Sequence, residues 1–408
     1  MINRFVFYLR NLFKKPFKVA IISYYYPDNL LSVNNGVAVH AYYLSQELAK
    51  IGCEVHVFAK GDKNTIKKQY IDNGRIVIHR IKTELDVSIE DFVTKKRMMY
   101  FIFDNKVISE VAKEHSRSEI NVLHTHGWLT SGAFISKYLN KIKWVHTFHA
   151  IEKNRVKFMS KEEKEYFSIS QWIESTIKYA DCLIAVSKNI REEVIKDFKV
   201  KSKKVVYIPN GVDLSLYNSE NHDYSQKKIL YVGRFSLEKG IDLIPKIAEQ
   251  VLMENNEARF IAVAKLQSIT SLDKTKVEFE RLSEEYPERF IWINDSLNRE
   301  ALAKLYKECI IYVQPSRYES FGLCVLEAMA CGNAVVVSNR GGLPEVVENA
   351  GLISQFNSSR VAEDILKLLG DYRLRERYSR RAIERAKLFA WENVALQVYN
   401  VYKTLAHK

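Results

Sequence analysis

The 408-residue chain lacks several features that would place it in a specialised class of protein. It has no apolar run of the roughly 20 residues that a membrane-spanning helix needs. Its 15 glycines and 7 prolines are few, and no stretch has low complexity, so collagen-like and disordered classes are excluded. Its five cysteines have neither the spacing of a zinc site nor that of a disulfide framework. We therefore expect a globular cytoplasmic protein with reduced cysteines, namely Cys53, Cys182, Cys309, Cys324 and Cys331.

Acidic residues are scarce in the first half of the chain. Residues 1–209 contain 35 Lys and Arg against 22 Asp and Glu, whereas residues 210–408 contain 27 of each, so the whole net charge of +13 belongs to the first half. Neither half contains a base-reading or base-stacking module, and we expect no nucleic acid as a partner. The excess charge instead favours an anionic acceptor or an anionic membrane surface.

Residues 1–17 contain no acidic residue, and their apolar side chains recur at helical spacing between Arg4, Arg10, Lys14 and Lys15. The segment is too short and too charged to span a bilayer, and it lacks the cleavage site of a signal peptide. Two interpretations stay open. The segment is either an anchor in the plane of the membrane, with the protein peripheral on the inner face, or a helix packed on the protein itself.

The order of apolar segments predicts two α/β domains. A buried strand at 18–23, a loop ending in Gly36, a helix at 37–51 and a strand at 55–59 form the opening of a doubly wound fold. The pattern restarts at 228–232, and 408 residues suffice for two domain cores. Pro209-Asn210-Gly211 has the composition of a turn. We expect an N-terminal extension, two doubly wound Rossmann-like domains and a final helix that crosses back to the first domain, at residues 1–17, 18–209, 210–388 and 389–408.

One stretch of the second half, Gln314–Val347, combines features that suit a phosphate and a sugar. A short strand ends at Pro315, and a helix begins near Phe321 or Gly322 and ends at Gly332. The unpaired N–H groups in the first turn of such a helix attract phosphate. Carboxylates suit hydroxyl groups better, and Glu319 and Glu327 lie just before and inside this helix. A ligand with sugars on both sides of a diphosphate would use both features.

Two cations bracket the loop that follows the strand at 228–232. Arg234 lies at its start and Lys239 at its end, next to a helix that we expect to begin at Gly240. Two cations beside a helix start suit a diphosphate, and the guanidinium can bind two oxygens at once.

Four histidines lie at the ends of two predicted strands, 120–125 and 143–147. Open α/β sheets bind ligands at the carboxyl ends of their strands. Zinc is a competing interpretation, but the pattern lacks a helical i,i+4 pair and a nearby acidic third ligand, so we expect no metal. The histidines are His124, His126, His146 and His149.

Together these segments resemble a known family. PSRYESFGLCVLEAMACG around Glu319 and Glu327, VGRFSLEKG at 232–240, IPNGVD at 208–213 and LHTHGW around His126 are similar to the retaining GT-B glycosyltransferases of family 4. That superfamily includes sucrose and glycogen synthases, and the resemblance covers nearly all of residues 18–400. It implies that the second domain holds a nucleotide-diphosphate sugar and the first holds the acceptor.

The resemblance also implies roles for individual residues. His126 faces the reacting sugar, Glu319 binds the hydroxyls of the transferred sugar, and Glu327 binds the ribose. The leaving diphosphate is stabilised by the cations and the helix start, that is by Arg234, Lys239, Phe321, Gly322 and Leu323.

Four further positions are interpreted in the same way. Gly36 approaches the diphosphate through its backbone, although the first glycine of the family's usual pair is Asn35 here. His149 lines the acceptor cleft, whereas His124 and His146 belong to the core.

The expected reaction is a retaining, metal-independent and cofactor-free transfer of a hexosyl group. The donor is a nucleotide-diphosphate sugar, with UDP favoured, and the acceptor is a glycan, a glycolipid or a lipid-linked sugar. Because no carboxylate nucleophile is evident in the first domain, we expect front-face attack, with the leaving phosphate taking the acceptor proton. The alternatives are a nucleotide-sugar epimerase or a phosphorylase of the same architecture, and an inactive sugar-binding or membrane scaffold protein.

Overall fold

The computed structural model describes residues 15–27, 35–62, 65–83, 92–127, 133–135, 137, 141–158, 164, 174–266 and 272–406. Most of the predicted extension at 1–17, and most of the helices expected at 128–139 and 161–179, lie outside these ranges. Within the described residues, no helix is both long enough and apolar enough to cross a membrane.

The first sheet has eight strands in the order β3-β4-β2-β1-β5-β6-β7-β8, and all neighbours are parallel except β3 and β4. Side chains of β1 alternate between the two faces, as strand geometry requires. Val19 and Ile21 join one core cluster, whereas Ala20 and Ile22 join another. The strands are β1 (Lys18–Ile22), β2 (Glu54–Gly61), β3 (Lys68–Ile71), β4 (Ile76–Lys82), β5 (Val122–His126), β6 (Lys143–Phe148), β7 (Cys182–Ala185) and β8 (Val205–Tyr207).

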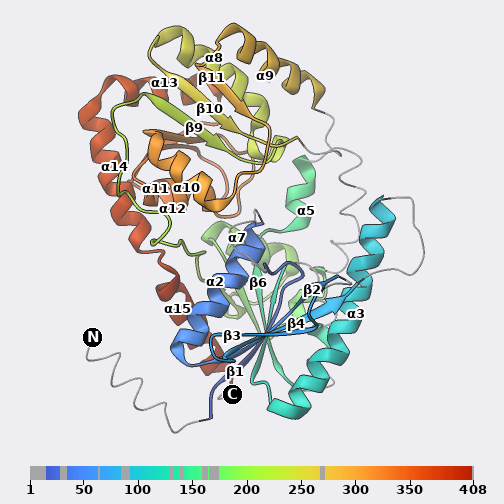
Figure 1. Ribbon diagram of the computed structural model, residues 1–408. Coiled ribbons are helices and arrows are strands. Elements are labelled where there is room, and N and C mark those ends of the chain that lie inside the picture. The colour runs from blue at the N-terminus through green and yellow to red at the C-terminus, as the bar shows by residue number, and fades with distance from the viewer. Residues whose placement is uncertain are drawn as a thin grey trace, which may run out of the picture.

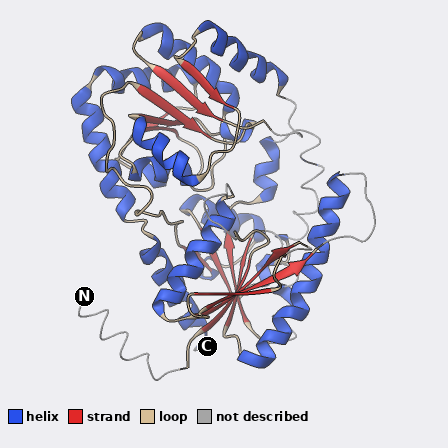
Figure 2. Ribbon diagram, in the orientation of Figure 1, coloured by secondary structure: helices blue, strands red, loops and turns tan. Residues whose placement is uncertain are grey.

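Helices cover both faces of this sheet (Figure 2). The cluster that contains Val19 and Ile21 also contains side chains of α2 and α15. The cluster that contains Ala20 and Ile22 also contains side chains of α3 and α7. Among the described residues, the connections also include the short helix α5 and several 3-10 turns. The bounds are α2 (Gly36–Ile51), α3 (Phe92–Ser118), α5 (Glu152–Arg155), α7 (Lys188–Phe198) and turns at Val156–Phe158, Ile177–Tyr179 and Ser202–Lys204.

The second sheet has six parallel strands in the order β11-β10-β9-β12-β13-β14. Its strands are β9 (Lys228–Val232), β10 (Arg259–Val263), β11 (Phe290–Ile293), β12 (Ile311–Gln314), β13 (Ala334–Ser338) and β14 (Leu352–Ser354). Its helices are α8 (Ile244–Glu254), α9 (Asp273–Glu285), α10 (Arg299–Glu308), α11 (Leu323–Ala330), α12 (Leu343–Val347), α13 (Ser358–Gly370) and α14 (Tyr372–Lys387).

The last helix, α15 (Trp391–Ala406), returns to the first sheet. Figure 1 shows α14 in the upper domain leading into α15, which lies beside α2 in the lower domain. Trp391 stacks on Tyr43 of α2, with ring centroids 5.5 Å apart. The chain therefore passes between the two sheets twice, once after β8 and once before α15. The exact boundaries after residues 209 and 388 stay predictions.

The two crossings touch each other. Val212 and Ala390 form a parallel bridge, and a Cβ atom on Gly211 would lie 2.3 Å from the Trp391 ring. Only glycine fits at that point.

Three details of the predicted elements are wrong. The edge strands β3 and β14 were not expected, and the helix expected at Gly240 begins instead at Ile244. Gly240 adopts a φ of +71°, which an α-helix does not tolerate, and it joins two 3-10 turns, Leu237–Lys239 and Ile241–Leu243. The prediction that Arg234 and Lys239 flank an α-helix start is therefore wrong as well.

All five cysteines are free, as expected.

Candidate active site

Loops from the carboxyl ends of both sheets meet between the domains. A Cβ atom on Gly36, at the start of α2, would lie 3.0 Å from Leu323 Cδ1, at the start of α11. Arg155 Nε of the first domain lies 3.7 Å from Glu238 Oε2 of the second. The Tyr318 hydroxyl, after β12, donates to Glu193 of α7 over 3.2 Å. Gly36 and Leu323, which were predicted from separate halves of the chain, are thus brought together.

Lys239 and Glu319 form an ion pair in this region. Lys239 ends the 3-10 turn after β9, Glu319 follows β12, and Nζ donates to Oε2 over 2.6 Å. Both side chains are largely buried, with 18% and 13% exposed. The two loops pack backbone against backbone, since a Cβ atom on Gly240 would lie 1.9 Å from the Pro315 carbonyl oxygen. This contact sets the lysine opposite the carboxylate.

The backbone of Glu319 is held from its other side by the glycine loop after β13. Its carbonyl oxygen accepts a hydrogen bond from Gly342 N over 2.7 Å. A Cβ atom on Gly341 would lie 2.1 Å from the same oxygen. The glycine pair therefore serves to position Glu319.

Arg234, after β9, donates to Glu238 Oε2 over 2.6 Å and keeps 37% of its side chain exposed. Burial would raise the pKa of Glu238, but the charges of Arg234, Arg155 and Lys239 lower it. These charges keep the carboxylate ionised, and each of the three cations is paired with a carboxylate before any ligand is counted. Neither Glu238 nor Arg155 was predicted from the sequence, because each is recognised as part of the site only through its contact with a loop of the other domain.

Glu327 lies in α11 and is 9% exposed. Burial raises the pKa of its carboxyl group, and the charge of Arg299, whose Nη2 lies 3.9 Å from Oε1, opposes that rise. The Tyr306 hydroxyl donates to Oε2 over 3.4 Å. Arg299 itself lies over the rings of Tyr43 and Tyr217. Arg299 and Tyr306, both of α10, orient this carboxylate, and no sequence motif marked either residue.

The N-terminus of α11 is open in the way that the sequence predicts. Gly322 is the N-cap residue with a φ of +110°, and no side chain caps the first turn. Phe321 is buried, and Leu323 is partly buried. The amides of this turn therefore have no side-chain acceptor at the cap.

The N-terminus of α2 differs from that of α11, because its own side chain caps it. Asn35 Oδ1 accepts from Val37 N and Ala38 N over 3.0 and 3.3 Å. Asparagine is a preferred N-cap residue. Asn35, which stands where the family usually has a glycine, therefore satisfies two amides of the helix start. Gly36 reaches the interdomain space, but the two amides after it are occupied.

His124 and His146 lie in the core, as expected, whereas the roles of His126 and His149 toward the sugars stay predictions. His124 bonds Tyr402 and Thr147, and His146 bonds Thr125, all inside the core. His126 Nδ1 lies 3.1 Å from His149 Nε2, at the carboxyl ends of β5 and β6. Burial lowers the pKa of His126 and of His149 well below the usual value, so both rings are neutral at pH 7.

A third ring, that of His40 in α2, completes this group and was not anticipated. Its centroid lies 5.0 Å from that of His126 and 4.6 Å from that of His149. Its Nδ1 lies 2.9 Å from Oδ1 of Asn210, at the first domain crossing. Burial lowers the pKa of His40 to about 4.

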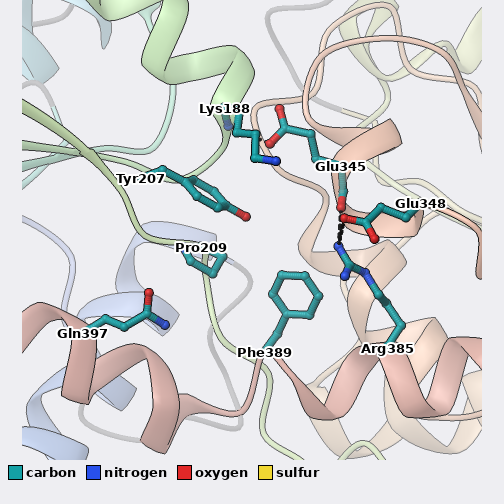
Figure 3. A pocket seen from close by; sticks show the side chains of 8 residues that line it. All are labelled: Lys188, Tyr207, Pro209, Glu345, Glu348, Arg385, Phe389 and Gln397. Carbon is teal, nitrogen blue, oxygen red and sulfur yellow. Dashed lines mark hydrogen bonds and ion pairs between the residues drawn. The ribbon is translucent and has the colours of Figure 1, made fainter. Parts of the chain in front are cut away.

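A cavity of about 280 Å³ opens elsewhere, next to the domain crossings (Figure 3). None of the predicted site residues lines it. In Figure 3, Lys188 and Glu345 face each other across the domain boundary, with Tyr207, Pro209 and Phe389 beside them. The cavity is lined by residues of both domains, among them Tyr207 and Arg385.

Two doubly wound domains with cations, carboxylates and an uncapped helix start between them define a GT-B glycosyltransferase. The family model described as "Glycosyl transferases group 1" matches residues 216–385, and "Glycosyltransferase Family 4" matches residues 34–216. The chain belongs to the group 1 glycosyltransferases and is a hexosyltransferase, as the sequence predicts.

Relatives support this assignment over the whole chain. O-antigen chain mannosyltransferase B of Escherichia coli is 31% identical over 282 residues, which are 64% of this chain and 70% of the relative. An uncharacterized glycosyltransferase of Methanocaldococcus jannaschii is 28% identical over 407 residues, 95% of this chain and 98% of the relative. The structure of sucrose-phosphate synthase from Thermosynechococcus elongatus shares the fold, with a TM-score of 0.75 at 24% identity over 95% of this chain and 98% of that one.

Proposed function

We propose that this enzyme transfers a hexosyl group, with retention and without a metal, from a UDP-sugar to a glycan, glycolipid or lipid-linked acceptor. The observation that carries the proposal is the ion pair of Lys239 and Glu319, within the second domain, beside Arg234 and the uncapped start of α11. These groups offer a diphosphate two cations and free amides, and they offer a sugar a carboxylate.

In this proposal the diphosphate replaces part of the internal pairing. Arg234 turns its exposed guanidinium from Glu238 toward the phosphate oxygens, and Glu238 keeps Arg155 as a partner. Lys239 neutralises charge on the leaving group, and Glu319 accepts hydrogen bonds from hydroxyls of the transferred sugar. Lys239 and Glu319 are held in place before the reaction by the glycine contacts, and such preorganised electrostatic groups are usually the largest contributors to catalysis.

The remaining residues complete the donor site. Glu327, held by Arg299 and Tyr306, accepts hydrogen bonds from the ribose hydroxyls. The neutral His126 offers a ring nitrogen to the transferred sugar. The acceptor attacks the face from which the diphosphate leaves, and the departing phosphate oxygen takes its proton, so no side chain is needed as a base.

A lipid-linked acceptor is favoured by the surface of α3 as well as by the charge of the first half. Met98 and Phe101 of this helix are 40% and 62% exposed, and Tyr25, which bonds Tyr100, is 39% exposed. Apolar side chains of this size beside exposed Lys95 suit the boundary between lipid headgroups and acyl chains.

The donor base is tested with a thermal-shift panel of UDP-, GDP- and ADP-sugars. A donor at 100 times its Kd should stabilise the folded protein by about 2.7 kcal/mol. A shift with a GDP-sugar or an ADP-sugar alone would overturn the UDP assignment, and the mannosyltransferase relative makes mannose a sugar to include in the panel.

The reaction class is tested by measuring nucleoside diphosphate release with and without an acceptor. Acceptor-dependent release supports transfer. Conversion of the sugar without release of nucleoside diphosphate would indicate an epimerase. Dependence on inorganic phosphate would indicate a phosphorylase. If a donor binds but is never turned over, the protein is an inactive scaffold.

A further inference from the structure

Three histidine rings from three separate elements converge in the first domain. They are His40 of α2, His126 at the end of β5 and His149 after β6, and one ring nitrogen of each lies within 4.8 Å of one from each of the others. His40 and His126 are 2% and 3% exposed. Their hydrogen bonds to described residues involve only Asn210 and one another. We call these three residues the histidine triad.

Two ring nitrogens of the triad have no partner in the described part of the chain, and the protonation of His40 shows that one of them carries a lone pair. Oδ1 of Asn210 can only accept, so His40 Nδ1 carries the proton and His40 Nε2 has a free lone pair. The buried Nε2 atoms of His40 and His126 both lack a partner among the described residues. Buried polar atoms are nearly always paired, so two unpaired nitrogens in one cluster indicate a missing ligand.

We propose that the histidine triad binds a zinc ion, and that zinc bound there inhibits the enzyme. Neutral imidazole nitrogens are zinc ligands, and three of them leave a fourth position open. In a tetrahedral site with Zn–N distances of about 2.0–2.1 Å the nitrogens lie roughly 3.3 Å apart. One ring nitrogen of each residue already lies within 4.8 Å of one from each of the others, so the rings need to close by only about 1.5 Å to reach that spacing. The Asn210 amide oxygen holds the His40 ring from behind, as outer partners do at metal sites.

A second cluster of possible ligands, His56, His79 and Glu114, is less suitable. His56 Nδ1 lies 3.1 Å from His79 Nε2, and His56 Nε2 lies 2.9 Å from Glu54 Oε1. Lys68 Nζ donates to Glu114 over 3.2 Å, so a metal ion would have to displace an existing cation. Its groups are satisfied without a metal, whereas those of the histidine triad are not.

The inhibitory effect rests on the proposed function, in which His126 faces the transferred sugar. Zinc on His126 would occupy the nitrogen that the sugar needs, so metal and donor sugar exclude each other. Mg²⁺ and Ca²⁺ prefer oxygen ligands and should not bind three imidazoles.

Binding is tested by calorimetric titration of the untagged full-length chain with ZnCl₂ and, separately, with MgCl₂. We expect one zinc ion per chain and no magnesium. His40→Gln and His149→Gln should each weaken zinc binding at least about tenfold, the lower limit seen even for outer partners of metal ligands. His149 is only partly buried, so its variant tests the site even if the His40 variant fails to fold.

His79→Gln is the matched control, since it removes a histidine from the second cluster and should leave zinc binding unchanged. Absence of zinc binding, or its loss in His79→Gln but not in His40→Gln, would overturn the proposed site.

Inhibition is measured separately, as the apparent KM for the donor with and without zinc. A rise that EDTA reverses supports the proposal, and bound zinc without inhibition overturns the inhibitory role. Absence of transfer with every donor would contradict the proposed function instead, and calorimetry would still decide the zinc site.

Discussion

Glu345 of the second domain caps a helix of the first. Its two carboxylate oxygens accept hydrogen bonds from Lys188 N and Asn189 N, the first two amides of α7, over 2.6 and 2.7 Å. Ser187 accepts from the next amide, that of Ile190. A carboxylate at a helix N-terminus satisfies unpaired donors and interacts favourably with the helix dipole. This contact therefore links the two domains on the side of the cavity shown in Figure 3.

The first prediction concerns this contact. Glu345→Gln removes the charge and leaves one acceptor oxygen, so it should lower the free energy of unfolding by about 1–2 kcal/mol. Denaturant unfolding measures the change. Glu348→Gln is the control, because Glu348 is 54% exposed in its pair with Arg385 and should change stability by less than about 0.5 kcal/mol. Equal effects of the two substitutions would show that Glu345 acts as an ordinary surface charge.

The second prediction concerns the diphosphate. Arg234→Ala should reduce kcat on the order of 100-fold, because a charge aimed at the leaving group is lost. Its thermal midpoint should stay within a few degrees of the wild type, since the side chain is 37% exposed. Lys265→Ala, after the neighbouring strand β10, removes an exposed cation and should keep normal turnover. Near-normal rates in Arg234→Ala would remove this residue from the donor site.

The third prediction concerns metals. Transfer should survive excess EDTA, because Arg234, Lys239 and the start of α11 stabilise the leaving group in place of a divalent cation. The assay compares initial rates before and after dialysis against the chelator. A complete loss that Mg²⁺ or Mn²⁺ restores would contradict it.

The fourth prediction concerns pH. Burial lowers the pKa of His40 and His79 to about 4 and that of His146 to about 3, whereas these residues titrate near 6.5 when unfolded. Between these values the unfolded chain binds protons that the folded chain does not, so stability falls as the pH falls below about 6.5. In the pH range between the two pKa values, each such histidine lowers the free energy of unfolding by up to about 1.4 kcal/mol for each pH unit of acidification.

Denaturant unfolding at pH 7, 6 and 5 measures this loss. His146→Gln should reduce the slope between pH 6.5 and 5, because it removes one of the groups that the unfolded chain protonates. A free energy of unfolding that does not change from pH 7 to pH 5 would contradict the burial of these rings in neutral form.

The fifth prediction concerns the membrane. The full chain should sediment with vesicles that contain anionic lipid, and salt should release it, because each basic residue near such a surface contributes roughly 1 kcal/mol. A chain that starts at Lys18 should bind more weakly. Vesicles without anionic lipid are the control. Equal recovery of both chains in the supernatant with both kinds of vesicle would exclude membrane binding and favour a soluble acceptor.

Buried elements were predictable from the sequence because their composition is dictated by burial itself. The central strands β1, β5, β9 and β12 lie within two residues of their predicted bounds, since a parallel strand covered on both faces reads as a continuous apolar run. The edge strands β3 and β14 were missed for the opposite reason. The sequence of β3, KQYI, is half polar, and its pairing with β4 depends on a left-handed turn at Asp72 and Asn73.

Candidate site residues were predictable from the sequence where a local sequence pattern marks them. Glu319, Lys239 and Arg234 were found through loops next to strands. His40 was missed because it occupies a helix with no chemical motif, and only the fold brings its ring to a centroid distance of 5.0 Å from that of His126. The partners of Glu327 were missed because Arg299 lies 28 positions earlier, in another helix.

The return of α15 to the first sheet has a consequence for synthesis. Trp391, Val394, Ala395, Val398 and Tyr402 complete the core beside Val19 and Ile21, so the N-terminal domain is unfinished until the end of the chain has left the ribosome. At about 5–20 residues per second, the roughly 200 residues after β8 take about 10–40 seconds to make. During that interval the apolar surface that α15 later covers is exposed to water.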